Sequence, residues 1–426
     1  MRLLIMRLVR LSFITILIIF TYTQLYTQSV FDAKRLSMAG SSYAIDEGNE
    51  YFGGNPATLA QKRSFNFELH LASAHFMVNN NSYTIEEYDR YFTTGDSLTR
   101  QEIDYLLGSI PETGLRGQVN LGVKALSFYT RPFSLTLGVI GNGYLNIPKD
   151  VFEFPLNGNI EVKEYSIDNA EGVAWTAGAI EFGIGYPITQ WTPTQFDFFS
   201  VGIAAKYLVG IEYANIQKAS GRIITTDNYL LADAYTETRR SSGGTGYGFD
   251  FGLLGVYEKN WTFSLHVNNI LGLISWNKDN ELQIVDFLSD SLLNVGELED
   301  LAVVNEDTTL SIGNFRTNLP RTITLASALQ YQPNLKITFA FRQGLNKSLG
   351  NITKPIVSVG TEYRPTSFLP LRGGIAIGGE SNFTLGLGLG IDLKYWQLNF
   401  GYLNHNFRWF RGSRSIDLAL NTLFRF

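Results

Sequence analysis

Few side chains in this sequence could perform acid–base or metal chemistry. The chain has four histidines, His70, His75, His266 and His405, and no cysteine, which excludes a thiolate nucleophile and a thiolate metal site. Neither a His-x-x-x-His spacing nor a nearby carboxylate pattern makes a metal site. Ser264 and His266 share a strand face, but residues two apart on a strand lie about 7 Å from each other. We therefore predict no enzymatic activity, no metal and no cofactor.

The last twelve residues indicate what kind of element builds this chain. From Ser415 to Phe426 apolar residues fall on one parity and mostly polar residues on the other, as in a strand with one face in an apolar environment. A soluble sandwich could also end in such a strand. A chain that ends on an aromatic residue, however, resembles the C-terminal signal strand of Gram-negative outer-membrane β-barrels. Phe424 and Phe426 would then be the assembly signal read by the insertion machinery.

The N-terminus predicts export. Three arginines precede a mostly apolar run at 11–20, and small residues at 27 and 29 fit a cleavage site, so residues 1–29 are predicted to be a secretory signal peptide. That run is too short to span a bilayer of roughly 30 Å as a helix. No longer apolar run follows it. An exported chain without a membrane helix is either soluble or a barrel, because only helices and closed barrels satisfy every backbone group in lipid.

Fourteen strand candidates follow the predicted signal peptide. Aromatic residues make up 14% of the chain and only four residues are Met, which favours strands over helical packing. Many candidates run for ten or more residues, the length that a tilted membrane strand needs. They lie at about 64–76, 117–129, 133–145, 172–186, 197–212, 244–257, 261–275, 321–331, 335–343, 355–364, 370–379, 382–393, 396–405 and 415–426.

The connections between these strands alternate in length. Those after even-numbered strands are mostly tight and those after odd-numbered strands mostly long, with exceptions at 187–196 and 380–381. A propeller or a sandwich would not sort its loops in this way. The pattern predicts an all-β transmembrane antiparallel barrel of about 14 strands, spanning residues 64–426, with both termini in the periplasm. The long connections are 77–116, 146–171, 213–243 and 276–320.

Glycine is concentrated on one face of two strands near the C-terminus. Gly374, Gly378, Gly386, Gly388 and Gly390 fall on the parity predicted to face the lumen. Glycine inside a strand often marks the close approach of another backbone or a ligand. These residues therefore predict room for a plug or a passage, although they could instead only relieve the strain of curvature.

The segment before the first strand carries a recognisable motif. Met38–Gly40 is followed by Asn55, Pro56 and Ala57 shortly before the first strand. In this position the sequence resembles the FadL family of outer-membrane transporters and its relatives, including the PorV subunit of type IX secretion, in an uncharacterised branch. The resemblance implies that residues 30–63 form an N-terminal hatch, or plug, inside the barrel.

The same resemblance implies a lateral exit made by a kink in the third strand. Gly138, Gly141 and Gly143 lie in the predicted third strand and could interrupt pairing or form a bulge. They fit an ordinary glycine-bearing strand end equally well. The lateral gate is therefore a hypothesis at this point.

Two predicted outer loops carry helical signals. Thr99 and Glu102 form a capping box ahead of an apolar run. Residues 281–307 hold eight acids, no Lys or Arg and interleaved large apolar residues, which predicts an amphipathic helix folded over the mouth. The acids could hold Ca²⁺ between lipopolysaccharide groups, or form an ordinary solvated acidic face. The glycine run at 242–248 has no following helix or Lys, so phosphate binding is not predicted.

These observations predict a barrel in the outer membrane of a Gram-negative bacterium that passes small hydrophobic compounds passively, because neither a nucleotide site nor an energy-coupling box is present. One alternative is a PorV-like docking or shuttle partner for secreted proteins, and another is a purely structural outer-membrane protein. The expected partners are outer-membrane lipid and lipopolysaccharide, the barrel-insertion machinery, and hydrophobic small molecules or secreted proteins. Nothing indicates nucleic acid as a partner.

Overall fold

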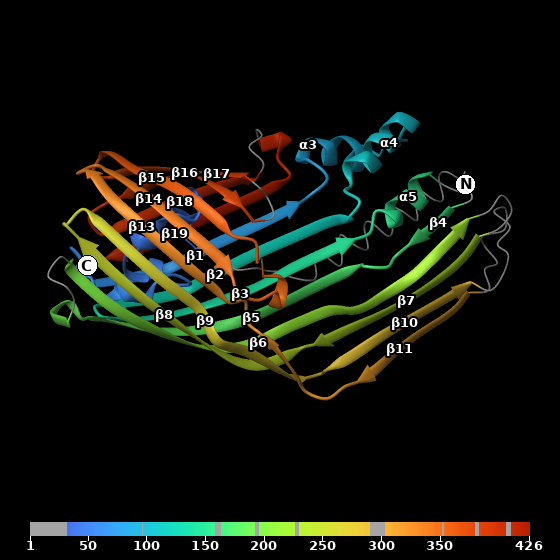
Figure 1. Ribbon diagram of the computed structural model, residues 1–426, viewed down its shortest axis with the longest axis horizontal. Coiled ribbons are helices and arrows are strands. Elements are labelled where there is room, and N and C mark those ends of the chain that lie inside the picture. The colour runs from blue at the N-terminus through green and yellow to red at the C-terminus, as the bar shows by residue number, and fades with distance from the viewer. Residues whose placement is uncertain are drawn as a thin grey trace.

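The computed structural model describes residues 32–95, 97–157, 163–191, 196–225, 230–289, 303–351, 353–379, 383–405 and 410–426. The predicted signal peptide lies outside the described residues, as do the first two residues of the predicted hatch. The described chain forms one long antiparallel sheet that closes into a barrel, with the N-terminal residues inside it (Figure 1).

The barrel closes where the first strand meets the last. Phe76 of β1 lies opposite Leu418 of β19 on one side and opposite Leu121 of β2 on the other, both antiparallel. All fourteen predicted strands are present, which confirms the prediction of a 14-stranded antiparallel barrel. They are β1 (Phe67–Asn80), β2 (Leu115–Thr130), β3 (Phe133–Ile147), β5 (Glu171–Pro187), β6 (Phe196–Thr225), β8 (Gly243–Tyr257), β9 (Trp261–Lys278), β13 (Thr322–Gln332), β14 (Leu335–Gly344), β15 (Ile356–Thr366), β16 (Leu369–Gly378), β17 (Phe383–Asp392), β18 (Trp396–His405) and β19 (Ser415–Arg425).

Five further strands lengthen part of the wall beyond one end of the barrel. The C-terminal part of β6, from Tyr213 to Thr225, pairs with β7 (Leu230–Ser241), and its last four residues also pair with β4 (Lys163–Ser166). Strand β7 in turn pairs with β10 (Glu281–Ser289). β10 also pairs with β11 (Val303–Ser311), and β12 (Phe315–Asn318) pairs with β9. These strands form an extended sheet at the right of Figure 1.

The amphipathic helix predicted within 281–307 is wrong for the residues that the structure describes, which form β10 and the start of β11. Ile284, Val285 and Phe287 are β-branched or aromatic residues that favour strands. Pairing with β7 on one side and β11 on the other satisfies the backbone groups of β10, and this tertiary pairing outweighs the helical periodicity of the sequence.

Short helices fill the connections and the N-terminal segment. The helix predicted after Thr99 is confirmed, with the Thr99–Glu102 capping box in place. None of the described helices is long and apolar enough to cross a membrane. The helical elements are α2 (Ala33–Ser37), η1 (Ser42–Ala44), η2 (Gly48–Tyr51), η3 (Pro56–Ala60), α3 (Ile85–Tyr88), η4 (Asp89–Thr93), α4 (Arg100–Ser109), α5 (Asp150–Asn157), η5 (Thr189–Trp191), η6 (Ser348–Gly350) and η7 (Phe410–Gly412).

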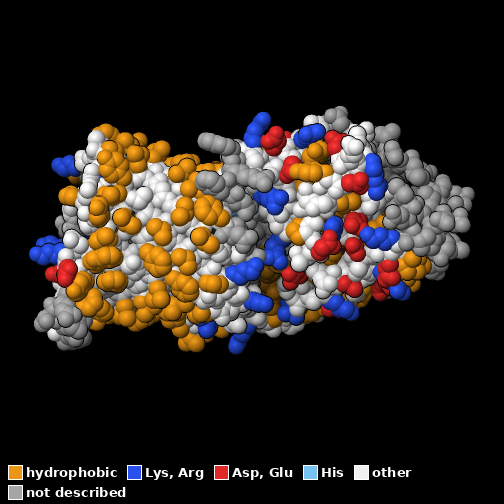
Figure 2. Space-filling model, turned by 45° about the horizontal axis from the view of Figure 1, so that its top comes forward, with side chains coloured by type: hydrophobic (Ala, Val, Ile, Leu, Met, Phe, Trp, Pro, Cys, Tyr) orange, Lys and Arg blue, Asp and Glu red, His pale blue; other side chains and the backbone are white. Residues whose placement is uncertain are grey.

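The barrel wall is apolar outside and polar inside, the reverse of a soluble domain. Along β3, Phe133, Leu135 and Leu137 are 36–41% exposed, whereas Ser134 and Thr136 between them are at most 2% exposed. Figure 2 shows hydrophobic side chains over the end of the molecule that holds β13 to β19, and charged side chains gathered over the other end. An outward apolar band of this kind is what lipid requires of a membrane barrel.

Candidate functional site

The N-terminal segment, residues 32–63, lies inside the barrel against the strands predicted to be rich in lumenal glycine. Helix α2 packs on β16 to β19. A Cβ atom at Gly386 would lie 2.6 Å from the carbonyl oxygen of Ser37, and one at Gly374 would lie 2.5 Å from that of Met38. Any side chain at these two positions would collide with the backbone of the segment. Glycine here permits close approach of the two backbones.

The other three predicted lumenal glycines have different surroundings. A Cβ at Gly388 would also collide with Ser37, so it belongs to the same contact. One at Gly390 would meet the side chain of Asn399 in the neighbouring strand. Gly378 borders an internal cavity at the end of β16 and has a φ of 102°, a conformation that other residues rarely adopt.

The Asn-Pro-Ala motif is the second point where the segment meets the wall. Asn55 is fully buried, and its side-chain amide donates to the carbonyl of Leu253 at 2.7 Å and to Ser264 Oγ at 2.8 Å. Its side-chain oxygen accepts from the N–H of Ala57 at 2.9 Å and so caps helix η3, which Pro56 begins. The motif therefore ties the segment to β8 and β9.

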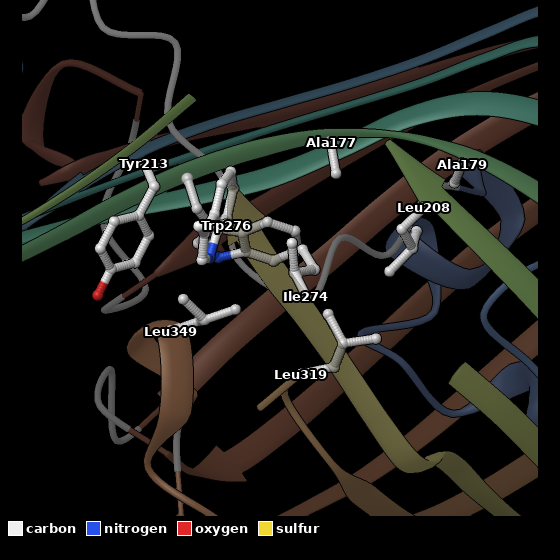
Figure 3. Close-up of a cluster of buried hydrophobic side chains, with 9 residues drawn as sticks. Ala177, Ala179, Leu208, Tyr213, Ile274, Trp276, Leu319 and Leu349 are labelled. Carbon is white, nitrogen blue, oxygen red and sulfur yellow. The ribbon is translucent and has the colours of Figure 1, made fainter. Parts of the chain in front are cut away.

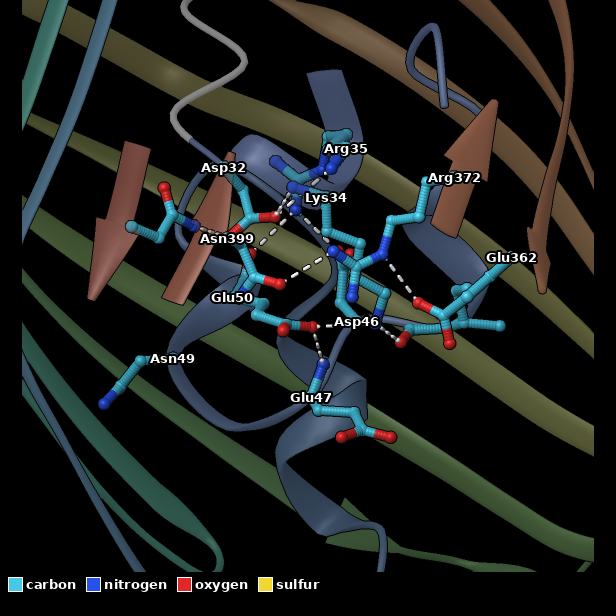
Figure 4. A network of polar contacts seen from close by, with 12 residues as sticks. Asp32, Lys34, Arg35, Asp46, Glu47, Asn49, Glu50, Glu362, Arg372 and Asn399 are labelled. Carbon is cyan, nitrogen blue, oxygen red and sulfur yellow. Dashed lines mark hydrogen bonds and ion pairs between the residues drawn. The ribbon is translucent and has the colours of Figure 1, made fainter. Parts of the chain in front are cut away.

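Buried ion pairs hold the N-terminal segment in one conformation (Figure 4). Arg35 pairs with Asp46 at 2.6 Å, and Lys34 pairs with Glu50 at 3.0 Å. Burial raises the pKa of the Glu50 carboxyl to about 7 in spite of the Lys34 ammonium beside it. Removing one partner of a buried pair leaves an uncompensated charge, so these pairs make rearrangement of the segment costly.

Charged side chains also join the segment to the wall. Arg425 of β19 lies 3.3 Å from the Glu47 carboxylate, and Arg63 lies 3.4 Å from it. Although burial alone would raise the pKa of Glu47, these two guanidinium groups hold it well below its usual range. Lys124 of β2 donates to the carbonyl of Asn49 at 2.9 Å. The two neighbours of β1 in the wall, β19 and β2, thus both contact the segment.

Two cavities adjoin the N-terminal segment inside the barrel. The first is bordered by Tyr43 and Phe52 of the segment and by Trp175 of β5. The second is bordered by α2 and by side chains of β1, β2 and β15 to β19. Thr322 and Arg342 border both cavities, so the two spaces lie next to each other.

An apolar cluster, drawn in Figure 3, shares Trp175, Ala179 and Leu319 with the lining of the first cavity. Helix η3 contacts the end of β5 near Gly185, whereas the cluster sits near the start of that strand. Leu349 enters the cluster from the loop between β14 and β15, and its carbonyl accepts a hydrogen bond from Asn142 of β3. This loop therefore reaches into the barrel. The buried cluster contains Trp175, Ala177, Ala179, Leu208, Tyr213, Ile274, Trp276, Leu319 and Leu349.

The two seams of the third strand, β3, are paired unequally. On the β5 side every residue from Phe133 to Asn146 has a partner. On the β2 side a bulge lies between Lys124 and Leu126. Gly141 and Asn142 have no paired residue in β2, whereas Ile140 and Gly143 on either side of them do. The β2–β3 seam is therefore the less continuous of the two.

The three glycines proposed as a lateral gate differ in their relation to this seam. Gly138 and Gly143 have partners on both sides of β3. Gly141 has a partner only on the β5 side, and it borders the first cavity together with Ile140. The structure thus places Gly141 between an internal cavity and the interruption in the wall.

The histidines lie on the inner face of the wall. His75 Nε2 lies 2.7 Å from one carboxylate oxygen of Asp417, and His405 Nε2 lies 3.4 Å from the other, beside the second cavity. Sequence reasoning missed this cluster because β1 meets β19 only when the barrel closes. Within the described ranges, no three His, Asp or Glu side chains are placed to hold a metal ion.

The C-terminal aromatic residues lie at the end of β19, beside the beginning of β1. Phe426 is 58% exposed and stacks on Tyr395 with a centroid separation of 6.0 Å. Its N–H donates to the carbonyl of Phe67 at 2.9 Å, which joins the last residue to the first strand. Phe424 lies opposite Leu69 of β1 and on the same parity as Phe426.

Two long stretches of the chain, residues 56–241 and 232–401, match the sequence profile of a family of unknown function, DUF5723. This chain belongs to the DUF5723 family. No curated protein matches it.

The fold of this DUF5723 chain is similar to that of several solved structures. A toluene transporter of Pseudomonas putida, TodX, is 13% identical with a TM-score of 0.55, over 93% of this chain and 98% of TodX. The Ralstonia pickettii toluene transporter TbuX is 13% identical with a TM-score of 0.53, over 93% and 98%. A FadL homologue from Pseudomonas aeruginosa is 11% identical with a TM-score of 0.50, over 94% and 98%. The DUF5723 chain thus has the FadL-type barrel fold, as the sequence analysis predicted.

Proposed function

We propose that this protein passes small hydrophobic compounds across the outer membrane of a Gram-negative bacterium. The observation that carries the proposal is the first cavity, which reaches the wall at Gly141 and is bordered by aromatic and aliphatic side chains together with polar and charged ones, among them Glu181 and Lys206. An apolar molecule gains free energy when it leaves water for the apolar part of this space, at roughly 25 cal/mol per Å² of apolar surface. The FadL-type fold, shared with two toluene transporters, supports this class of compound.

In this proposal the N-terminal segment is a hatch, and the compound travels by partition and diffusion alone. It enters past the apolar cluster around Leu349, occupies the first cavity and leaves through the β2–β3 seam into the membrane. The bulge beside Lys124 and the interruption of strand pairing at Gly141 make this seam a weak part of the wall beside the cavity. Lateral exit would spare an apolar molecule the passage through the ion-paired N-terminal segment.

Replacing Gly141 and Gly143 with valine is expected to lower uptake of radiolabelled toluene severalfold. Valine favours strand pairing where glycine weakens it, so the seam should become continuous. The measurement is the rate of toluene uptake by cells that produce the variant and no other copy of this protein. Gly178→Val in β5 is the matched control, because a Cβ there would have only the carbonyl oxygen of Val209 within 4 Å, at 3.9 Å. Unchanged uptake in a folded Gly141→Val/Gly143→Val barrel would contradict lateral exit.

A further inference from the structure

The extended sheet beyond the barrel has a long free edge, β11. This strand pairs with β10 on one side, and within the part of the chain that the structure describes it has no partner on the other. Figure 1 shows β11 at the margin of the sheet. The edge arises from unequal strand lengths. The next strand of the wall, β14, ends at Gly344 opposite Thr322 and so does not reach β11.

The direction of the outward backbone groups of β11 follows from its pairing. The N–H of Ile312 donates to the carbonyl of Asn280 at 2.9 Å, in register with the β10–β11 ladder. Backbone groups of an antiparallel strand point alternately to one neighbour and to the other. Even-numbered residues of β11 therefore bond to β10, and Asn305, Asp307 and Thr309 direct their N–H and C=O groups to the free edge. Such a row is a template for an added strand.

The negative charge near this edge favours a basic partner. The described acidic side chains of β10 and β11 are Glu281, Asp286 and Asp307, and all three are exposed, whereas neither strand contains Lys or Arg. A second copy of β11 would add more acids, whereas lysine or arginine on an incoming strand would compensate those present.

We propose that the free edge of β11 binds an extended, basic segment of another protein by strand addition. Main-chain hydrogen bonds at Asn305, Asp307 and Thr309 supply the affinity, and the acids of β10 and β11 supply the preference for a basic strand. This inference goes beyond the proposed passage of hydrophobic compounds and is independent of it, since it uses no residue that borders the cavities.

The test compares two synthetic peptides on the full-length protein in detergent micelles. One has nine residues with alternating threonine and lysine, and the other has the same sequence N-methylated at every internal amide. The methylated peptide keeps its charge and loses its hydrogen-bond donors. We expect it to bind roughly tenfold more weakly, the equivalent of about one to two backbone hydrogen bonds. Equal affinities, or no binding by either peptide, would overturn the proposal.

A variant tests the edge from the side of the protein. Asp307→Pro together with Thr309→Pro removes two outward donors and no hydrogen bond to β10, as proline tolerates an edge strand with its nitrogen toward solvent. The unmethylated peptide should bind this variant as weakly as the methylated peptide binds the wild type. Asp307→Ser is the control for charge and should cost less. Wild-type affinity in the double proline variant contradicts strand addition, and if that variant fails to fold, the two peptides on the wild-type protein still decide.

Discussion

Replacing Gly374 with valine is expected to make the barrel leak small solutes. A Cβ at this position would lie 2.5 Å from the carbonyl oxygen of Met38, so the backbone of the N-terminal segment must move away from β16. We expect a severalfold faster swelling of proteoliposomes in small sugars. The matched control is Gly373→Val on the other face of the same strand, where a Cβ would have only the carbonyl oxygen of Gly386 within 4 Å, at 3.9 Å.

Deleting residues 30–60 is expected to give the largest increase in the swelling rate of the proteoliposomes. The deletion removes the contacts of the segment with the wall, among them that of α2 with the glycine-rich strands and that of Asn55 with β8 and β9. Swelling should then be faster than in Gly374→Val. A folded deletion variant that swells no faster than wild type would show that the segment does not obstruct the lumen.

Replacing Phe424 and Phe426 with aspartate is expected to abolish accumulation of the protein in the outer membrane. The two aromatic residues share one parity, and Phe426 is exposed and stacked on Tyr395. Aspartate would put carboxylates on the lipid-facing side of the last strand, where aromatic residues are favoured at the membrane interface. The measurement is the amount of heat-modifiable protein in isolated outer membranes.

Phe426→Tyr is the control for this prediction. Tyrosine keeps the ring that stacks on Tyr395 and is as well suited to the membrane interface. It should therefore leave accumulation close to the wild-type level. Normal accumulation of the double aspartate variant would contradict the assignment of these residues as the assembly signal.

The barrel could be predicted from the sequence because its signal is local. Alternation of apolar and polar residues marks every wall strand, and the face of a strand follows directly from residue parity. Thus the apolar neighbours of Gly386 on the opposite parity assign this residue to the lumen. The extension of β6 to Thr225 was not predicted, because its upper part does not continue that alternation.

The parts that could not be predicted depend on contacts between distant residues. The helical periodicity of 281–289 is outweighed by pairing with β7, which lies about forty residues earlier in the chain. Leu349 gives no local sign that its loop enters the barrel, and Asp417 meets His75 only when the first and last strands pair. The Asn-Pro-Ala motif identified the N-terminal segment, but its partners in β8 and β9 are known only from the fold.

The most direct test of the proposed passage is the entry of an apolar compound through the purified protein. Proteoliposomes containing the wild-type chain, the Gly141→Val/Gly143→Val variant or the Gly178→Val control would be given radiolabelled toluene, and the initial rate of entry would be compared with that of protein-free vesicles of the same lipid. We predict that the wild type and the control raise this rate and that the Gly141→Val/Gly143→Val variant does so much less. A wild-type rate equal to that of protein-free vesicles would contradict the proposal that this barrel passes hydrophobic compounds.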